Sequence, residues 1–407
     1  MRDRATKRLV DLASPEPNAF STGPFGSAVS SKHFTTSGVP MIRGSNLSES
    51  ISTRLIDQDI VFLPQRFCEE FARSVARRGD LVFTCWGTIG QIGLIDETSK
   101  FEKYIVSNKQ MRFRPDPRVA FPEFLYYFLS QPSMLDYVRS QSIGSSVPGF
   151  NLGQLKQIEV ALPDIRDQEA IVDVLGALDD KIAANQKLLA VGQELICTSW
   201  DWICREAEGT LPFSSIAEIN PRTAVTASRA AYLDMKNLPQ GGMLIESWDA
   251  REVRSGARFR NGDTLLARIT PCFENGKLGF VDNLAVDEVA VGSTEFIVLR
   301  PRTNVPYAAP FCVASTLEFR DHAEKGMTGT SGRQRVQPSA LGSFSIPVPT
   351  TEEMTKFGEV SDSLLRRLGK ARNENQVLAQ TRDELLPLLM DGRITVEQAE
   401  RTVEEVL

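Results

Sequence analysis

Long apolar runs are absent from this 407-residue sequence. It contains no stretch of about 18 consecutive apolar residues, which is the length that a membrane-spanning helix requires. Residues 1–14 mix charged and apolar side chains and lack the apolar core of a signal peptide. We therefore expect a cytoplasmic protein that has no membrane partner.

Histidine and closely paired cysteine are also scarce. The chain has two histidines, His33 and His322, and its six cysteines are scattered without a CxxC pair. Structural zinc sites need such residues at short spacings, and disulfide frameworks belong mainly to secreted proteins. We expect no metal site, and free thiols that are mostly buried in a reducing compartment.

Several catalytic motifs are missing. Nothing matches a P-loop, HExxH or GxSxG. Residues 220–222, Asn-Pro-Arg, lack the second proline and the aromatic residue with which amino-methyltransferases hold a flipped base. The glycines of residues 87–93 are spaced GxxGxxG and indicate a turn rather than a dinucleotide site. The sequence gives no reason to assign a catalytic residue or a cofactor to this chain.

Two long amphipathic segments are present, at residues 164–205 and 352–391. Apolar residues recur along each with the 3.5-residue spacing of a coiled coil. At about 1.5 Å per residue the first helix would run roughly 60 Å, so its stripe needs a partner helix, which the second segment can supply. The expected seam residues are Ile171, Leu175, Leu178, Ile182, Leu189, Ile196, Phe357, Leu364, Leu368, Leu378 and Leu385.

The chain is internally duplicated. Each long helix follows a short segment that begins with a leucine and ends with a proline, at 155–163 and again at 341–349. Further upstream, Gly79-Asp80 and Gly262-Asp263 each open an apolar strand. Such self-similarity predicts a repeated architecture. We expect an α+β fold in which two similar mixed α/β domains are separated by two long antiparallel coiled-coil helices with pseudo-two-fold internal symmetry. The predicted domains are residues 1–163, 164–210 (first helix), 211–349 and 350–407 (second helix and tail).

Charge is distributed unevenly along these segments. Residues 1–163 carry 19 Lys and Arg against 16 Asp and Glu, whereas residues 164–210 carry 4 against 10. Residues 211–349 carry 15 against 14, and residues 350–407 carry 8 against 12. The net charge of -6 therefore lies on the helices, and the globular parts are near neutral or basic. Nucleic-acid binding by the globular parts is compatible with this pattern, and so are simply solvated helix faces.

Local patterns predict further elements in the two globular parts. Residues 66–78 form an amphipathic pattern that predicts a helix ended by Gly79. Residues 80–95 predict two strands around a glycine-rich turn, and 104–114 alternate as one strand. Residues 122–139 predict a helix that breaks at Pro132. In the second copy, 294–299 predict a strand and 310–322 a helix.

The chain resembles the specificity subunit of a type I DNA restriction-modification system over essentially its whole length. Besides the repeated plan, the resemblance lies in residues 38–47 (GVPMIRGSNL), 79–90, 158–182 (from IEVALPDIRDQEAI to LDDKI) and 388–394. The family usually has Glu-Gln where this chain has Asp167-Gln168. The second copy lacks that glutamine in residues 350–354.

The resemblance implies a function. Such a subunit has two target recognition domains, each of which reads half of a bipartite sequence in double-stranded DNA. The helices act as a spacer and dock two modification (adenine methyltransferase) subunits, with separate restriction subunits. The partners, rather than this chain, would use S-adenosylmethionine, ATP and magnesium. Half-sites one turn apart are about 34–36 Å apart, a separation that a coiled coil can set.

Base reading needs polar side chains on loops that reach a groove, while Lys and Arg contact phosphates. Residues 333–335 (Arg-Gln-Arg) are the strongest candidates, because they place two guanidiniums and an amide in a Gly/Ser-rich loop. The DNA-binding candidates of the first domain are Ser30, Ser31, Lys32, Arg43, Ser45, Asn46, Trp86, Thr88, Lys109, Ser145 and Ser146. Those of the second are Arg222, Lys236, Asn237, Arg268, Thr270, Arg333, Gln334 and Arg335.

Two alternatives stay open. The chain could be a catalytic DNA methyltransferase or endonuclease subunit, although its motifs are missing. It could also be a coiled-coil interaction scaffold whose globular parts bind protein rather than DNA.

Overall fold

The structure is a computed structural model that divides into two compact units. The first unit comprises Met1–Ala183 with Val377–Leu407, and the second comprises Ala184–Gln376. Each of the two long helices therefore contributes one part to each unit. The residues that the structure describes are 4–26, 28–87, 89–141, 149–225, 227–330 and 332–407.

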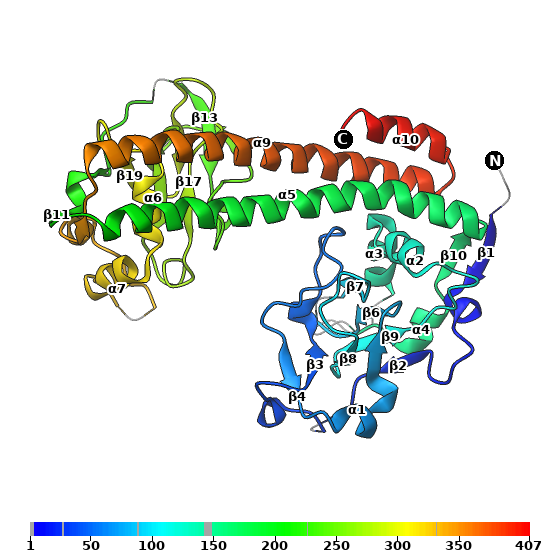
Figure 1. Cartoon of the computed structure of the whole chain (residues 1–407). Coiled ribbons are helices and arrows are strands. Elements are labelled where there is room, and N and C mark those ends of the chain that lie inside the picture. The colour runs from blue at the N-terminus through cyan, green and yellow to red at the C-terminus, as the bar shows by residue number, and fades with distance from the viewer. Residues whose placement is uncertain (1–3, 27, 88, 142–148, 226, 331) are drawn as a thin grey trace. The chain divides into compact units, whose positions relative to one another are not determined.

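The globular part of the first unit combines short strands with short helices (Figure 1). Its strands are β1 (Ala5–Arg8), β2 (Phe20–Thr22), β3 (Val39–Ile42), β4 (Val61–Leu63), β5 (Val75–Arg77), β6 (Leu81–Thr84), β7 (Ile92–Leu94), β8 (Lys103–Val106), β9 (Gln110–Phe113) and β10 (Glu159–Leu162). Its helices are α1 (Phe67–Glu70), α2 (Pro122–Leu129), α3 (Pro132–Ser140) and α4 (Leu152–Lys156).

The globular part of the second unit also combines short strands with short helices. Its strands are β11 (Thr210–Pro212), β12 (Ala217–Ile219), β13 (Arg229–Leu233), β14 (Asp249–Glu252), β15 (Ala257–Phe259), β16 (Thr264–Ala267), β17 (Leu278–Phe280), β18 (Ala290–Gly292), β19 (Phe296–Pro301) and β20 (Ser345–Pro347). Its helices are α6 (Ala309–Ser315), α7 (Leu317–Lys325) and α8 (Pro338–Gly342).

The sheet topology of the two globular parts is the same. The first has sheets of order β2-β9-β6-β7 and β4-β3-β8-β5, and the second has β12-β19-β16-β17 and β14-β13-β18-β15. The pair β1-β10 that precedes the first long helix likewise corresponds to β11-β20. In each copy the third strand in chain order pairs in parallel with the eighth, β3 with β8 and β13 with β18. The predicted internal duplication is therefore confirmed strand by strand.

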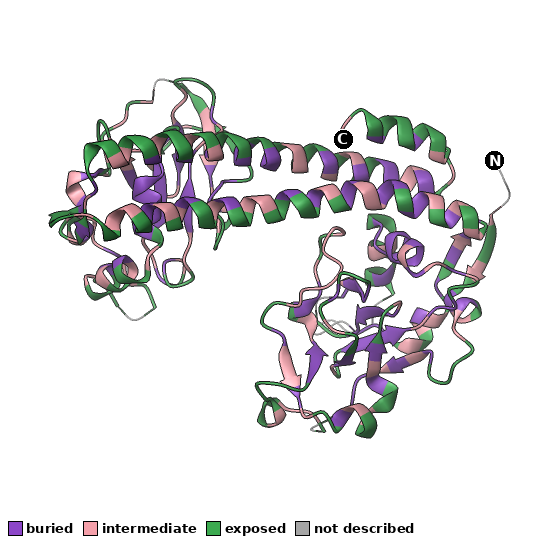
Figure 2. Ribbon diagram, viewed as in Figure 1, coloured by how far each residue is buried: buried purple, intermediate pink, exposed green. Residues whose placement is uncertain are grey.

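The two long helices are α5 (Ile165–Arg205) and α9 (Thr351–Met390), followed by α10 (Val396–Glu404). In each unit α5 and α9 pack together, and buried residues recur along both helices (Figure 2). Every predicted seam residue is buried except Leu189 and Leu364, which are half-buried. Leu365 is buried in place of Leu364, because it packs into the core of the second globular part.

Polar residues within the seam have specific partners, and these contacts show that the helices are antiparallel. In the first unit Arg382 donates to Asp179 at 2.8 Å. In the second unit Asn185 donates to Asn375 at 3.0 Å. Further along α5, Gly192 lies against Leu368, which is nearer to the start of α9, and a Cβ atom on Gly192 would lie 2.6 Å from a Leu368 methyl carbon. Glycine therefore allows the close approach of α9, because a larger residue at position 192 would force Leu368 to shift.

The family-like motif at the start of α5 has a structural explanation. The buried side chain of Gln168 accepts from the Phe121 N–H at 2.8 Å and donates to the Pro163 carbonyl at 2.9 Å, which ties the first turn to the globular part. The second copy replaces this with a local cap. The Thr350 N–H donates to Glu353 at 2.8 Å and its hydroxyl accepts from the Glu353 N–H at 3.3 Å. The missing glutamine thus changes how α9 is started, but not whether it forms.

The predicted local elements are mostly confirmed, with three corrections. The helix predicted over 310–322 is two helices, α6 and α7, because the backbone is extended at Thr316, whose side chain caps α7. The prediction of one helix over 66–78 is wrong, because α1 ends at Glu70 and β5 follows, pairing with β8 so that Val75 lies opposite Ile105. The single strand predicted over 104–114 is two strands, β8 and β9, separated by a turn. In both places tertiary pairing overrides the local pattern. The helix break at Pro132 is confirmed, and Pro132 starts α3.

Among the helices of the described residues, none is both long enough and apolar enough to cross a membrane. Within the same part of the chain, no group of three or more His, Cys, Asp or Glu side chains is placed to hold a metal ion.

Candidate DNA-recognition surfaces

The repeated Gly-Asp motif forms the same ion pair in both globular parts. The buried carboxylate of Asp80 accepts from the Arg114 guanidinium at 2.7 and 2.8 Å and from the Arg77 N–H at 2.9 Å. Asp263 accepts from Arg300 at 2.8 and 2.7 Å, and from a backbone N–H at 2.9 Å. The motif therefore fixes the entry to the central strand, and its aspartate has no free surface to offer a ligand.

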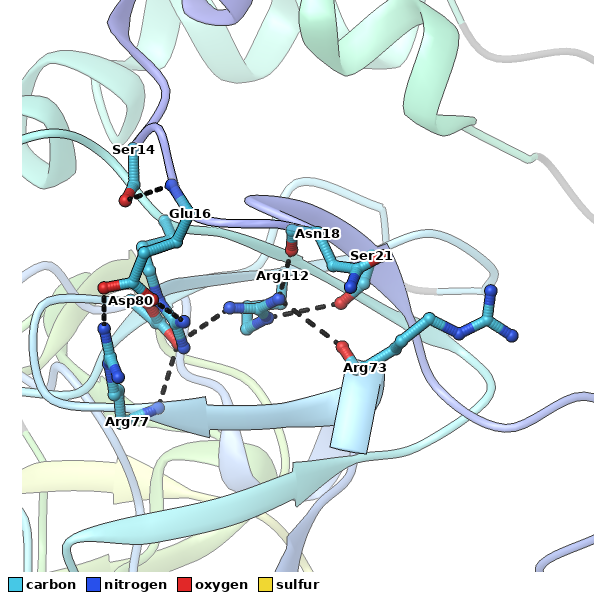
Figure 3. Close-up of polar contacts among 9 residues, drawn as sticks. Ser14, Glu16, Asn18, Ser21, Arg73, Arg77, Asp80 and Arg112 are labelled. Carbon is cyan, nitrogen blue, oxygen red and sulfur yellow. Dashed lines mark hydrogen bonds and ion pairs between the residues drawn. The ribbon is translucent and has the colours of Figure 1, made fainter. Parts of the chain in front are cut away.

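In the first globular part a second arginine extends this network inward (Figure 3). Arg112 is buried and donates to Asp80 at 3.3 Å, to the Ser21 hydroxyl at 3.2 Å and to the carbonyls of Asn18 and Arg73. Burial lowers the pKa of Arg112, although the charge of Asp80 opposes that effect. The network joins β2, β9 and the segment before β5, and so it stabilises the globular part from inside.

The second globular part has Val298 at the position of Arg112. Arg112 is opposite Val82, two residues beyond Asp80, and Val298 is opposite Leu265, two residues beyond Asp263. Around Val298 there is a cavity of about 670 Å³. Its lining includes three arginines, and none of the described residues that line it is acidic. The lining residues are Asn220, Pro221, Arg222, Thr223, Ala224, Gly256, Ala257, Arg258, Arg268, Thr294, Phe296 and Val298.

Two predicted DNA-binding residues, Arg222 and Arg268, meet at this cavity, and sequence reasoning missed Arg258. Arg222 and Arg258 are exposed at its edge. The Nε atom of Arg268 is buried without a hydrogen-bond partner among the described residues, because Glu295, at 4.0 Å, is too distant. The arrangement favours an anionic ligand.

Arg335 belongs to residues 333–335, the strongest DNA-binding candidates, but its side chain is bound to the protein itself. Its guanidinium donates to Glu295 at 3.0 and 2.7 Å, which raises the pKa of Arg335 and lowers the pKa of Glu295 through the same hydrogen bonds. The Gln334 carbonyl accepts from the Thr270 N–H at 3.1 Å, and Thr270 is buried. Arg333 remains exposed. Within residues 333–335, therefore, Arg333 offers the free guanidinium, whereas Arg335 neutralises a carboxylate.

The first globular part brings five predicted residues together around one cavity of about 480 Å³. Trp86, 51% exposed, packs on the backbone of Gly149, where a Cβ atom would come within 2.6 Å of the ring. The predicted residues that line the cavity are Ser30, Arg43, Ser45, Trp86 and Lys109. The other lining residues are Pro24, Val29, Phe34, Met41, Gly44, Thr84, Gly87, Ser107, Asn108 and Gln110.

Three side-chain atoms in this cavity lining are buried without a hydrogen-bond partner among the described residues: Arg43 Nε, Thr84 Oγ1 and Gln110 Nε2. Buried polar groups are satisfied in the great majority of cases, so three such atoms in one cavity lining indicate a site for a polar ligand. Sequence reasoning missed Thr84 and Gln110. They are strand residues in apolar surroundings, and no local pattern distinguishes them from structural polar residues.

Other predicted residues have different positions. Asn46 is buried, accepting from the Arg43 N–H at 3.0 Å and donating to the Ile56 carbonyl at 2.9 Å, so it fixes a turn. Ser31 and Lys32 are exposed, as is Lys236, while Asn237 is half-buried. Thr88, Ser145 and Ser146 lie outside the described residues.

Comparisons with known proteins support the family resemblance. Residues 28–191 match the type I restriction modification DNA specificity domain. The EcoEI specificity subunit of Escherichia coli is 26% identical over 239 residues, covering 55% of this chain and 38% of that protein. The EcoAI specificity subunit, also from Escherichia coli, is 28% identical over 215 residues, covering 49% and 34%. The matches thus span well under two thirds of those relatives.

The fold comparison covers the whole molecule. The S subunit of a type I restriction-modification system from M. genitalium aligns with 96% of this chain and 97% of its own length, with a TM-score of 0.59 and 12% identity. At that identity the similarity concerns the fold, and it includes both globular parts and both long helices. In sequence the chain is similar to type I restriction-modification specificity subunits, through residues 28–191 and the curated relatives, and over 96% of its length it has the fold of the M. genitalium S subunit.

Proposed function

We propose that this chain reads a bipartite sequence in double-stranded DNA, with each globular part contacting one half-site. The observation that carries this proposal is the duplication. Two globular parts of the same topology each have a cavity lined by predicted DNA-binding residues and by no described acidic residue. Basic and polar side chains around a hollow surface are suited to phosphates and base edges.

The cavities differ in chemistry, which supports separate reading of the two half-sites. The first offers an amide, a hydroxyl and exposed aromatic rings, and the second offers three guanidiniums. Gln110 on β9 and the equivalent Phe296 on β19 each line a cavity, so equivalent strands present different groups. Each half of the target would then be specified by its own globular part.

We further propose that the long helices dock two modification subunits. In the second unit, Val191, Leu195 and Trp202 are exposed on α5, with Trp202 65% exposed. At 100° per residue these three lie within about 40° of one another around the helix, and so form one apolar stripe. An exposed apolar stripe on a helix that already has one partner favours a further helical partner.

The catalytic chemistry would reside in the partners. Modification subunits would bind S-adenosylmethionine and methylate adenine, and restriction subunits would use ATP and magnesium, in the cytoplasm. This chain would supply recognition and no catalytic residue. Incubating the purified chain with DNA and labelled S-adenosylmethionine tests the alternative of a catalytic subunit, because incorporated label would contradict the proposal.

Methylome sequencing of cells with and without this chain tests the recognition function. We expect a bipartite methylated sequence that disappears when the chain is removed and is lost when Trp202→Ser and Leu195→Ser together disrupt docking. A methylation pattern that does not depend on the chain would contradict DNA recognition and favour the interaction scaffold.

A further inference from the structure

The cavity of the first globular part has three unpartnered polar atoms. Gln110 is 1% exposed and Thr84 is 3% exposed, yet Gln110 Nε2 and Thr84 Oγ1 have no hydrogen-bond partner among the described residues. Arg43 Nε is in the same state. A buried polar group that makes no hydrogen bond is destabilising, so a ligand that satisfies all three groups would be favoured.

Two aromatic side chains line the same cavity. Trp86 and Phe34 are both exposed, and the Arg43 guanidinium lies 5.9 Å from the centre of the Phe34 ring. Exposed rings beside a hollow can stack on a planar ligand. Lys109 is exposed in the same lining and can contact an attached phosphate. A planar, hydrogen-bonding group joined to a phosphate is a nucleotide.

The free atoms also select the kind of base. The Gln110 Oε1 atom accepts from the Ser107 hydroxyl, which leaves its amide N–H groups as the free donors. Gln110 therefore offers its free N–H groups more readily than its engaged oxygen, which disfavours the paired donor and acceptor contact that recognises adenine. With Arg43 Nε as a second N–H donor, the cavity favours a base with adjacent acceptors, which are O6 and N7 in guanine.

The depth of these donors decides the position of the base. Gln110 and Thr84 belong to the central strands β9 and β6 and are almost entirely buried. A base within a duplex presents its edge in a groove and cannot reach atoms at the base of a cavity. We propose that the first globular part holds one guanine of its half-site outside the DNA stack, between Trp86 and Phe34, with Gln110, Thr84 and Arg43 bonded to its edge.

The second globular part provides an internal contrast. Ala267 stands at the position of Thr84 and Phe296 at that of Gln110, as the strand pairing shows. Ile269 stands at the position of Trp86. The hydroxyl, amide and indole are thus all absent from the equivalent place, so the proposal concerns the first half-site alone.

The first test uses the full-length chain and free deoxynucleosides, with binding followed by saturation-transfer NMR. We expect deoxyguanosine to bind at least tenfold more tightly than deoxyadenosine. Thr84→Val and Gln110→Met should each weaken deoxyguanosine binding by tenfold or more while retaining the melting temperature. Thr264→Val is a matched control, because its hydroxyl is also buried without a partner among the described residues but lies in the second globular part. Equal binding of all four deoxynucleosides would overturn the base preference.

The second test rests on the proposed function and uses the methylated target with the assembled complex. Each cytosine opposite a guanine of the first half-site is replaced in turn by the fluorescent analogue pyrrolocytosine, which brightens when it loses its paired guanine. We expect one position to brighten on binding, and Gln110→Met to remove that change. Tight binding without brightening at any position would overturn the proposal. If no methylation depends on the chain, the proposed function fails. The deoxynucleoside experiment alone then decides whether the cavity binds guanine.

Discussion

Replacing Arg382 by leucine removes one partner of a buried ion pair that joins α5 to α9 in the first unit. The Asp179 carboxylate accepts from Arg382 at 2.8 Å and from the Tyr127 hydroxyl at 2.6 Å, and both charged side chains are 5% exposed. Burial acts to lower the pKa of Arg382, but the charges of Asp179 and Asp383 and the hydrogen bonds to them together outweigh burial and raise that pKa. The arginine therefore stays charged and neutralises the carboxylate within the seam.

The expected cost follows from what each substitution leaves behind. Arg382→Leu leaves a buried carboxylate with Tyr127 as its hydrogen-bond donor, and should destabilise the first unit by about 3–5 kcal/mol. Asp179→Leu should cost less, because Arg382 also donates to Asp383 at 2.9 and 2.7 Å, and Asp383 is exposed. The double substitution removes both charges from the seam and should be more stable than Arg382→Leu alone.

Hydrogen exchange is measured at increasing urea concentration in peptides from residues 165–183 and 377–390. These peptides belong to the first unit, so unfolding of the second unit does not obscure the unfolding of the first. The coupling free energy between the two substitutions is obtained from the double-mutant cycle, with Arg393→Leu as a control at an exposed arginine of the same unit. Additive effects of the two single substitutions would refute the reasoning, because they would show that the pair does not interact in the seam.

Three further predictions concern the helices and the second globular part. Leu175→Asp with Leu178→Asp should unfold the paired helices of the first unit and abolish assembly with modification subunits, because unpaired buried charges cost several kcal/mol; an unchanged melting temperature would contradict this. Exchanging residues 211–349 for the matching segment of a relative should change one half of the methylated sequence and leave the other, as read by methylation of a library randomised at both half-sites. Arg335→Ala should reduce methylation of all sequences about equally, by exposing Glu295 to DNA phosphates, and Glu295→Gln should restore it; a loss confined to one base of the second half-site would instead show direct base contact.

The helical part of the fold was the most predictable from sequence, because apolar periodicity over about 40 residues gives a strong signal. The polar positions were harder to interpret. Arg382 falls on the expected stripe, but its partner Asp179 belongs to a run of charges that resembles a solvated face. Short segments of the globular parts were less predictable, since the pairing of β5 with β8 decides the state of residues 75–77 and depends on residues about 30 positions away.

The candidate DNA-binding residues stay predictions, and the structure shows where each one lies. Exposed loop residues such as Trp86 and Lys109 line the first cavity, where polar and aromatic side chains can serve binding. Asn46 and Thr270 look the same in sequence but bond inward to the backbone. Whether a polar side chain turns toward a ligand or toward its own turn depends on local geometry that no spacing rule encodes.

A comparison of the two copies shows why the family can be read from the sequence while the target cannot. The groups that the copies share are those that build the scaffold, such as the Asp80–Arg114 and Asp263–Arg300 pairs, which have nearly the same hydrogen-bond lengths. The groups that differ line the cavities, as with Gln110 against Phe296. A repeated scaffold needs the same residues wherever it folds, so its motifs recur and carry the family resemblance. The proposed recognition of two different half-sites would require different residues at equivalent positions, which are found by comparing the two copies in the folded chain.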